Sequence, residues 1–371
     1  MPQIEAIVSQ FIADDTFLHS LPYGEGHIND TYSICMQKPD GSIYRMILQR
    51  INHNVFVDPA GLMRNIYGVT QFLKKKIATY NGDVMRETLT VIPTKSGDIY
   101  YIDPDGHYWR MYVFVENTVT YQSCRDEQDF YNCGVAFGNF QRLLSDYNTN
   151  DLIETIPDFH NTIKRFDALK EAINNDKVGR VKYVQDEIAF ALEREKDAGV
   201  LIEMLDESTI PYRVTHNDTK LNNILIDKES GKGICVIDLD TVMPGAAAFD
   251  FGDSIRFGAS TAAEDETDLD KVSMSLRLFE VFADGYLSVA GEFLTPKEVE
   301  SLAVGAKIMT FECGIRFLTD YLSGDTYFKI HRQNHNLERC RTQFKLVGDM
   351  ELKMDQMQAI IKRYAKIDTI S

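Results

Sequence analysis

The chain has 371 residues, of which 44% are hydrophobic and 26% charged, a size and composition typical of a globular protein with two domains or two lobes. Acidic residues outnumber basic ones by 56 to 39, and the formal charge of −17 argues against a nucleic-acid partner. The six cysteines are scattered, and neither an apolar run long enough to span a membrane nor a signal peptide is visible, so we expect a cytoplasmic protein without a membrane partner.

The first third of the chain predicts a small antiparallel sheet. Short stretches rich in β-branched and aromatic residues alternate with turn sequences. The expected strands are residues 31–36, 44–50, 90–93, 99–102 and 109–115. The last three are expected to form consecutive hairpins. A helix is expected at 59–76, because Asp58 is a suitable N-cap and Pro59 fits the first helical turn.

The residues after about 117 follow the helical period instead, with apolar side chains three and four positions apart. The expected helices are residues 126–145, 160–174, 183–205, 270–290, 296–322 and 346–366. A short strand pair, 224–226 and 234–237, interrupts them. The pattern predicts an α+β protein with a small β-rich lobe, 1–115, and a larger, mostly helical lobe, 116–371.

The strongest chemical pattern lies in segment 214–239. Asn223 follows Asp218 by five residues, and Asp238 follows Asn223 by fifteen. Phosphoryl transfer needs one carboxylate that orients the attacking hydroxyl and accepts its proton. It also needs an amide and a second carboxylate that hold Mg²⁺ against the nucleotide phosphates. The spacing therefore assigns Asp218 the first role, and Asn223 with Asp238 the second.

Lys220 strengthens this interpretation. It follows Asp218 by two residues, where its charge would face the phosphoryl group during transfer. Each of these positions alone has a simpler explanation, since aspartates and asparagines commonly form turns and helix caps. Four such residues at these offsets, flanked by two short apolar strands, favour a phosphotransferase site.

These motifs resemble a known family. HNDTK, NN and VIDLDTVMPG, together with GEGHINDTY near the N-terminus, resemble the protein-kinase-like fold of aminoglycoside phosphotransferases, choline kinases and sugar kinases. They are particularly similar to bacterial N-acetylhexosamine 1-kinases, and FDFGDSIRF and FLTDYLSGDTYFK extend the resemblance over nearly the whole chain. The resemblance implies a nucleotide-binding lobe at 1–115 and a catalytic and sugar-binding lobe at 116–371.

The resemblance also implies a set of nucleotide contacts. Gly24 and Gly26 would let backbone N–H groups approach the phosphates. The strand lysine of protein kinases is missing, and Arg50 is expected in its place, with a surface arginine as the alternative. Adenine is expected against the backbone around Val115, with Leu225 as an apolar floor or as ordinary core.

Three further acidic residues lie near these motifs. Asp250 and Asp253 belong to a segment that resembles the one steadying the catalytic loop in this fold, so we expect structural roles for both. Asp240 follows Asp238 by two residues and is expected to bind the metal or to support its ligands.

Acceptor contacts are implied mainly by the segment after residue 310. By resemblance, Arg316 and Tyr327 contact the sugar together with Asp218, and His27 faces the sugar or the phosphates. Each has an alternative. Arg316 and Asp320 are four residues apart and would suit a surface pair, Tyr327 would suit the core, and His27 would suit a turn cap.

Together these residues predict a kinase that uses ATP and Mg²⁺ to phosphorylate the anomeric hydroxyl of an N-acetylhexosamine, GlcNAc or GalNAc. Two other functions remain open. One is a kinase of another small hydroxyl acceptor, such as another sugar, an amino alcohol or an aminoglycoside. The other is a nucleotide-binding pseudokinase, against which the intact catalytic residues argue. The oligomeric state stays open.

Overall fold

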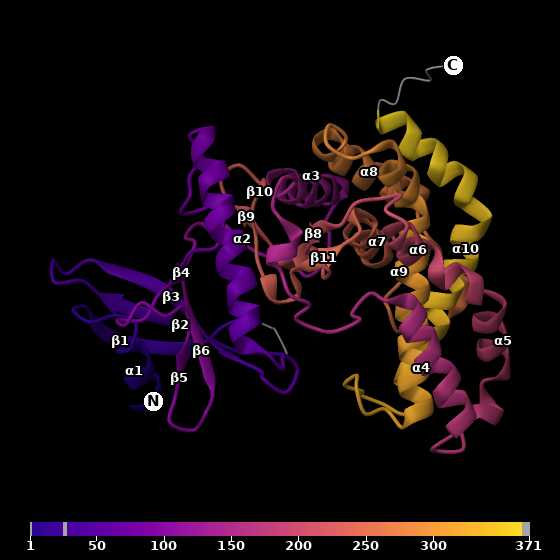
Figure 1. Ribbon diagram of the computed structural model, residues 1–371, viewed down its shortest axis with the longest axis horizontal. Coiled ribbons are helices and arrows are strands. Elements are labelled where there is room, and N and C mark those ends of the chain that lie inside the picture. Colours follow the sequence, from indigo (N-terminus) through magenta and orange to yellow (C-terminus); the bar gives the residue numbers. More distant parts are fainter. Residues whose placement is uncertain (1, 25–27, 366–371) are drawn as a thin grey trace. The chain divides into compact units, whose positions relative to one another are not determined.

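The computed structural model describes residues 2–24 and 28–365 (Figure 1). The chain forms two compact units, each assembled from segments far apart in the sequence. The first unit comprises Met1–Val119, Asp146–Pro157 and Leu225–Met243. The second unit comprises Thr120–Ser145, Asp158–Ile224 and Pro244–Ser371. The division into a nucleotide-binding and a sugar-binding lobe remains a prediction.

The first unit is built on a six-stranded antiparallel sheet in the order β1-β2-β3-β6-β4, with β5 also paired to β6. Its strands are β1 (Thr16–Pro22), β2 (Asp30–Gln37), β3 (Ile43–Ile51), β4 (Val91–Ile92), β5 (Tyr101–Ile102) and β6 (Tyr108–Val113). The five expected strands are confirmed, and β1 is additional. The predicted hairpin between β4 and β5 is wrong, because both pair with β6, near its end and its start respectively.

Two helices belong to the first unit together with this sheet. Helix α1 (Pro2–Val8) contributes Ile7 to a cluster that contains Leu48 and Met111 on one face. Helix α2 (Pro59–Thr79) begins as predicted, because the Asp58 side chain accepts a hydrogen bond from the Gly61 N–H at 2.8 Å. The helix expected at 59–76 is therefore confirmed.

A second, three-stranded sheet has the order β10-β9-β7. It contains β7 (Thr118–Val119), β9 (Ile224–Asp227) and β10 (Gly233–Val236). The predicted strand pair after residue 223 is thus confirmed. Its turn is closed by Asp227, whose side chain accepts hydrogen bonds from the Glu229 and Ser230 N–H groups at 3.2 and 2.7 Å. A short 3-10 helix, η5 (Leu239–Thr241), follows β10.

The second unit is mostly helical. Its helices are α3 (Glu127–Leu143), α4 (Thr162–Asn175), α5 (Gln185–Glu193), α6 (Val200–Asp206), α7 (Ala247–Gly258), α8 (Leu276–Ala290), α9 (Pro296–Ser323) and α10 (His335–Tyr364). The chain also forms a two-stranded sheet of β8 (Arg213–Thr215) and β11 (Met243–Gly245). The helix expected at 183–205 is interrupted between α5 and α6. Helix α10 begins at His335, well before the expected residue 346. The prediction missed this start because the first turns of α10 bury polar residues.

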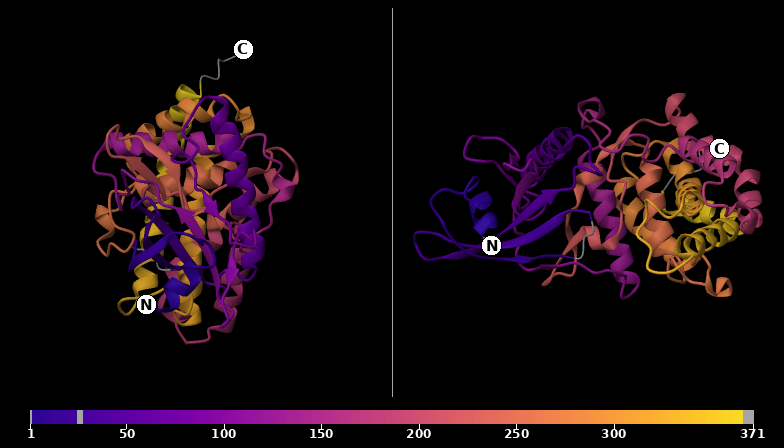
Figure 2. Two further views of the ribbon diagram at one scale, coloured as in Figure 1. Left: turned by 90° about the vertical axis from the view of Figure 1, so that its left-hand side faces the viewer. Right: turned by 90° about the horizontal axis from the view of Figure 1, so that it is seen from below.

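Helix α9 is central to this unit. It packs along α10, α7 and α4, and Figures 1 and 2 show α9 in orange beside the yellow α10. The crossing of α7 and α9 is close, because a Cβ on Gly252 would lie 2.5 Å from the Gly305 carbonyl oxygen. Phe311 and Leu318 of α9 join the hydrophobic core with Phe166 of α4.

A β-rich unit and a mostly helical unit confirm the expected α+β class. The six cysteines are free thiols, and Cys133, Cys235 and Cys340 among them are buried. In residues 2–24 and 28–365, no helix combines the length and the apolar character that crossing a membrane requires.

Candidate active site

Asp218, Lys220 and Asn223 lie together on the loop between β8 and β9. The Lys220 Nζ is 2.7 Å from Asp218 Oδ1. The Asn223 amide donates to the Asp218 carbonyl oxygen at 2.8 Å and to its Oδ2 at 3.1 Å. The Asp218 side chain is 31% exposed, so its carboxylate is supported from within the second unit and is still open to a ligand.

The charge of Lys220 is set by its neighbours. Burial disfavours the ammonium ion, but the carboxylates of Asp218 and Asp253 outweigh this effect and raise the pKa of Lys220. Lys220 is therefore a cation at neutral pH. A cation at this position can balance negative charge that develops during phosphoryl transfer.

Helix α7 holds the backbone of this loop. Asp250 accepts the N–H groups of His216 and Asn217 at 2.9 and 2.8 Å. Asp253 accepts the Thr219 N–H at 3.0 Å. The Thr219 hydroxyl in turn donates to the Asp250 carbonyl oxygen at 2.6 Å. The structural roles expected for Asp250 and Asp253 are thereby confirmed.

The side chains proposed for Mg²⁺ have suitable oxygen atoms. Because the Asn223 amide nitrogen is bound to Asp218, its Oδ1 is the atom left to serve as a metal ligand. Asp238 has a left-handed backbone, with φ of 59°, directly before η5. An amide oxygen and a carboxylate fit a hard divalent cation. Asn223 belongs to the second unit and Asp238 to the first, and their shared role remains a prediction.

Asp240 forms a buried ion pair with Arg110 inside the first unit. The guanidinium binds both carboxylate oxygens, at 2.5 and 2.9 Å, and donates to Gln49 at 3.0 Å. The Asn29 side chain also donates to Asp240, at 2.6 Å. Arg110 is 1% exposed and Asp240 3%. Both carboxylate oxygens are thus in use, which favours a supporting role for Asp240 over direct metal binding.

We expect Arg110→Met to lower the free energy of unfolding by about 3–5 kcal/mol, because it leaves the Asp240 carboxylate buried without its cation. Denaturant titration measures this loss. The matched control is Arg45→Met, whose partner Glu116 and own side chain are 53% and 43% exposed. The control should cost at most about 1 kcal/mol. Equal losses in the two variants would show that the buried Arg110–Asp240 pair contributes no more to the free energy of unfolding than the exposed pair.

Arg50 is bound to a neighbour on the next strand. Its Nε donates to Asp30 Oδ2 at 2.7 Å, and its side chain is 41% exposed. Side chains alternate along a strand, so Arg50 lies on the same face of the sheet as Leu48, which belongs to a cluster with Ile7 of α1. Gln49 lies on the opposite face, where it contacts Arg110. A phosphate contact by Arg50 remains a prediction, and it would compete with this ion pair.

The other predicted nucleotide residues are only partly described. Gly24 has φ of 79°, a conformation that glycine adopts without strain. Gly26 and His27 lie outside the described residues. Val115 is buried, and its carbonyl oxygen accepts a hydrogen bond from the Thr118 hydroxyl at 2.8 Å; Leu225 is half-buried in β9.

The sequence matches a family model described as the phosphotransferase enzyme family over residues 89–282, which is more than half of the chain. The matched residues include the loop that carries Asp218, Lys220 and Asn223. The chain belongs to the phosphotransferase enzyme family.

Solved structures of other kinases resemble this phosphotransferase over nearly its whole length. A microcompartment-associated aminopropanol kinase is 14% identical and covers 96% of this chain and 98% of its own, with a TM-score of 0.55. A choline kinase from Cryptosporidium parvum Iowa II is 14% identical and has a TM-score of 0.56; the match covers 98% of this chain and 99% of the choline kinase. An amicoumacin kinase in complex with AMP-PNP, Ca²⁺ and Ami is 14% identical and has a TM-score of 0.55; the match covers 93% of this chain and 92% of that kinase. These likenesses confirm the expected kinase-like fold.

In this phosphotransferase, Arg316 lies in an aromatic setting on α9. Its guanidinium carbon is 5.2, 6.0 and 5.6 Å from the ring centres of Phe159, Tyr327 and Phe328. Its Nη1 is 4.0 Å from Glu312 Oε1, and its side chain is 17% exposed. The structure thus brings Arg316 and Tyr327 together, and their contact with a sugar remains a prediction.

Asp320 does not pair with Arg316. Its carboxylate accepts the N–H groups of Thr326, Tyr327 and Phe328 at 2.8, 2.8 and 2.9 Å, and so fixes the loop after α9. The alternative of a surface pair is therefore wrong. Tyr327 is 65% exposed, so the alternative of a core tyrosine is wrong as well.

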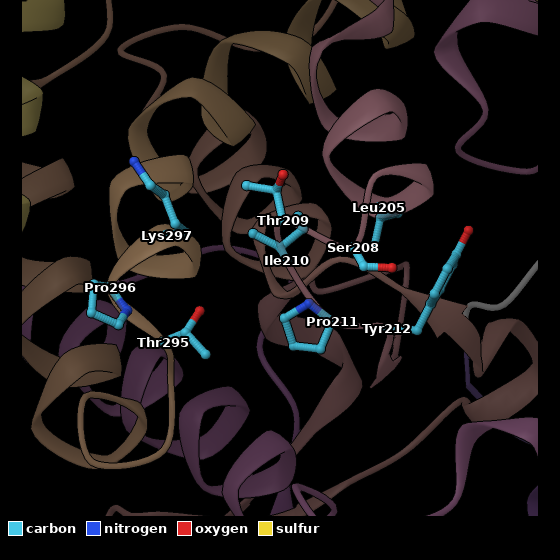
Figure 3. A pocket seen from close by; sticks show the side chains of 9 residues that line it. All are labelled: Leu205, Ser208, Thr209, Ile210, Pro211, Tyr212, Thr295, Pro296 and Lys297. Carbon is cyan, nitrogen blue, oxygen red and sulfur yellow. The ribbon is translucent and has the colours of Figure 1, made fainter.

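Two cavities are described in the second unit. One of about 570 Å³ lies between the end of α6 and the start of α9 and contains none of the predicted site residues (Figure 3). The other, of about 350 Å³, is lined by Thr219, Lys220 and Leu221 of the catalytic loop and by Arg125. The second cavity therefore adjoins the candidate catalytic residues.

Sequence reasoning missed two buried charged residues beside predicted site residues: Arg110, which binds Asp240, and Glu312, which lies 4.0 Å from Arg316. Arg110 stands in the apolar run WRMYVFV and Glu312 in MTFECGI. A single charge inside an apolar run predicts a buried pair, since such a charge needs a partner. This signal was present for both residues, although it does not name the partner.

Proposed function

We propose that this phosphotransferase moves the γ-phosphoryl group of ATP to the anomeric hydroxyl of an N-acetylhexosamine, GlcNAc or GalNAc. The main observation in support of phosphoryl transfer is the arrangement of Asp218 with Lys220 and Asn223. Asp218 would align the hydroxyl with the phosphate and accept its proton. An anomeric hydroxyl is more acidic than an ordinary alcohol, so alignment is the larger part of this task.

Nucleotide binding would use both a metal and the glycine loop. Asn223 and Asp238 would hold Mg²⁺, which when bound neutralises charge on the phosphate oxygens. Gly24 and Gly26 would approach the phosphates, and Val115 and Leu225 would contact adenine. The similar amicoumacin kinase was solved with AMP-PNP and Ca²⁺, which supports a nucleotide and a divalent cation in this fold.

The charge around Arg316 supports a neutral acceptor. Burial lowers the pKa of Arg165, and the charge of Arg316 lowers it further, so the two guanidinium groups lie near each other. A cationic amino alcohol or aminoglycoside would be repelled there. The hydroxyl groups and the N-acetyl carbonyl of a hexosamine are neutral hydrogen-bond acceptors that a guanidinium can bind.

An acceptor panel with ATP and Mg²⁺ tests this proposal. The panel contains GlcNAc, GalNAc, glucose, choline, ethanolamine, aminopropanol and an aminoglycoside, and ³¹P NMR identifies the product. We expect a sugar 1-phosphate from GlcNAc or GalNAc. Phosphorylation of an amine-bearing acceptor alone would overturn the sugar assignment, and no turnover with any acceptor would favour a pseudokinase.

Arg316→Ala should raise the KM for the sugar by about tenfold to 150-fold, which corresponds to the ~1.5–3 kcal/mol of a lost charged hydrogen bond. The KM for ATP should stay within about twofold, since Arg316 makes no proposed nucleotide contact. Initial rates at varied sugar and varied ATP measure the contrast.

The matched control is Arg339→Ala. Arg339 lies on α10, its side chain is also 17% exposed, and its guanidinium carbon is 5.4 Å from the centre of the Phe317 ring. Its loss should change neither KM. If Arg316→Ala and the control have the same effect on the sugar KM, Arg316 does not bind the acceptor.

A further inference from the structure

A buried chain of contacts joins α9 to the catalytic loop through His160, just before α4. Its Nδ1 is 2.7 Å from Glu312 Oε1, and its Nε2 is 3.3 Å from the Asn217 carbonyl oxygen. His160 is 9% exposed, Asn217 4% and Glu312 1%. This chain therefore lies in the interior of the second unit.

The partners of His160 fix the orientation of its ring. A backbone carbonyl oxygen and a carboxylate oxygen only accept hydrogen bonds, so Nε2 donates to Asn217 and Nδ1 donates to Glu312. On the other side, Glu312 Oε2 accepts a hydrogen bond from the Thr162 hydroxyl at 2.7 Å. Burial opposes ionisation of Glu312, but His160 and Arg316, with the Thr162 hydrogen bond, lower its pKa. An ionised carboxylate thus anchors the ring.

The bond to Asn217 acts directly on the neighbouring Asp218. The Asn217 C=O and the Asp218 N–H belong to one planar peptide unit, so holding the carbonyl fixes the plane from which Asp218 departs. The other end of this plane is also held, since the Asp218 N–H donates to His216 Nδ1 at 3.3 Å. Asn217 has φ of 65°, a left-handed conformation that asparagine adopts more readily than most residues.

We propose that His160 is a positioning residue for phosphoryl transfer, which holds the Asn217–Asp218 peptide so that the Asp218 carboxylate is aimed at the acceptor hydroxyl. This inference rests on the proposed function of Asp218. Glu312 also approaches the proposed sugar contact Arg316. Its Oε1, the atom that faces His160, lies 4.0 Å from Arg316 Nη1. One carboxylate thereby supports both the proposed base and the proposed sugar contact.

Two substitutions separate the two hydrogen bonds of His160. The amide nitrogen of glutamine reaches the place of Nε2, whereas that of asparagine reaches only the place of Nδ1. His160→Gln therefore keeps the bond to Asn217, and His160→Asn keeps the bond to Glu312. We expect His160→Asn to lower kcat by about tenfold or more and His160→Gln to keep it within about threefold, with the ATP KM unchanged in both.

His335→Asn is the matched control. His335 is 2% exposed on α10 and its Nε2 is 3.0 Å from an Asp265 carboxylate oxygen, so the variant disturbs a similar buried contact away from the catalytic loop. Its kcat should equal that of the unaltered protein. If His160→Asn and His160→Gln lose kcat equally, in proportion to their loss of thermal stability, His160 has a merely structural role.

Hydrogen exchange of a peptide containing Asp218 gives a readout that does not depend on activity. We expect faster exchange of the Asp218 amide in His160→Asn than in His160→Gln or His335→Asn. Equal exchange in the three variants would overturn the inference. Failure of the unaltered protein on the acceptor panel would instead overturn the proposed function, so the two results are distinguishable.

Discussion

Replacing Asp218 by asparagine is expected to lower kcat by at least about a hundredfold, at the low end of what a general base contributes. Asparagine preserves the size of the side chain but cannot accept the proton of the attacking hydroxyl. ATP affinity should remain nearly unchanged, because Asp218 is proposed to touch only the acceptor. Steady-state rates give kcat, and calorimetric titration gives the Kd for ATP.

Asp206→Asn provides the control for this substitution. Asp206 is an exposed aspartate at the end of α6, so its replacement removes the same charge from the chain without touching the catalytic loop. Its kcat should equal that of the unaltered protein. If Asp218→Asn stays within a few-fold of this control, Asp218 is not the base.

Asp238→Ala should abolish both catalysis and the Mg²⁺-dependent part of ATP binding. Asp238 is the only carboxylate in the proposed metal pair, and an amide oxygen alone binds Mg²⁺ weakly. Titration of ATP with Mg²⁺ and with EDTA measures the metal-dependent part. The unaltered protein should bind ATP more tightly with Mg²⁺, and the variant should show no difference.

Asp227→Ala is a control at a neighbouring acidic position. Asp227 ends β9, and its carboxylate binds Arg86 and the turn after β9. That variant should retain the Mg²⁺ effect on ATP binding. An unchanged Mg²⁺ effect in Asp238→Ala would exclude Asp238 as a ligand.

Local features of the fold were predictable because they depend on neighbouring residues. The Asp58 cap and Pro59 determine where α2 begins, and the alternation of apolar residues determines the strands. Pairing was less predictable, because β4 pairs with the more distant β6 although β5 follows it directly in the sequence. The start of α10 was missed since His335 and Asn336 are polar and buried, which contradicts the apolar pattern of a helix face.

The same distinction applies to the candidate site. Asp218, Lys220 and Asn223 lie within one short loop, so their spacing was enough to predict that they meet. The Arg110–Asp240 pair joins residues separated by 130 positions, and no local pattern identifies such a partner. Arg50 illustrates the limit, since its strand was predicted but its ion pair with Asp30 on the neighbouring strand was not.

The close contact between Gly252 and Gly305 has a consequence for changing the acceptor range by directed evolution. Neither position has room for even a methyl group, since the added carbon would lie 2.5 or 2.6 Å from a backbone oxygen of the facing helix. The helix with Asp250 and the helix with Arg316 are therefore locked in register, and substitutions that tilt one against the other lose stability before they gain a new substrate. The adaptable part is the loop at 325–328, whose backbone is held by Asp320 while the Tyr327 side chain remains exposed. Libraries randomised in that loop should yield new acceptors more often than libraries randomised at the helix crossing.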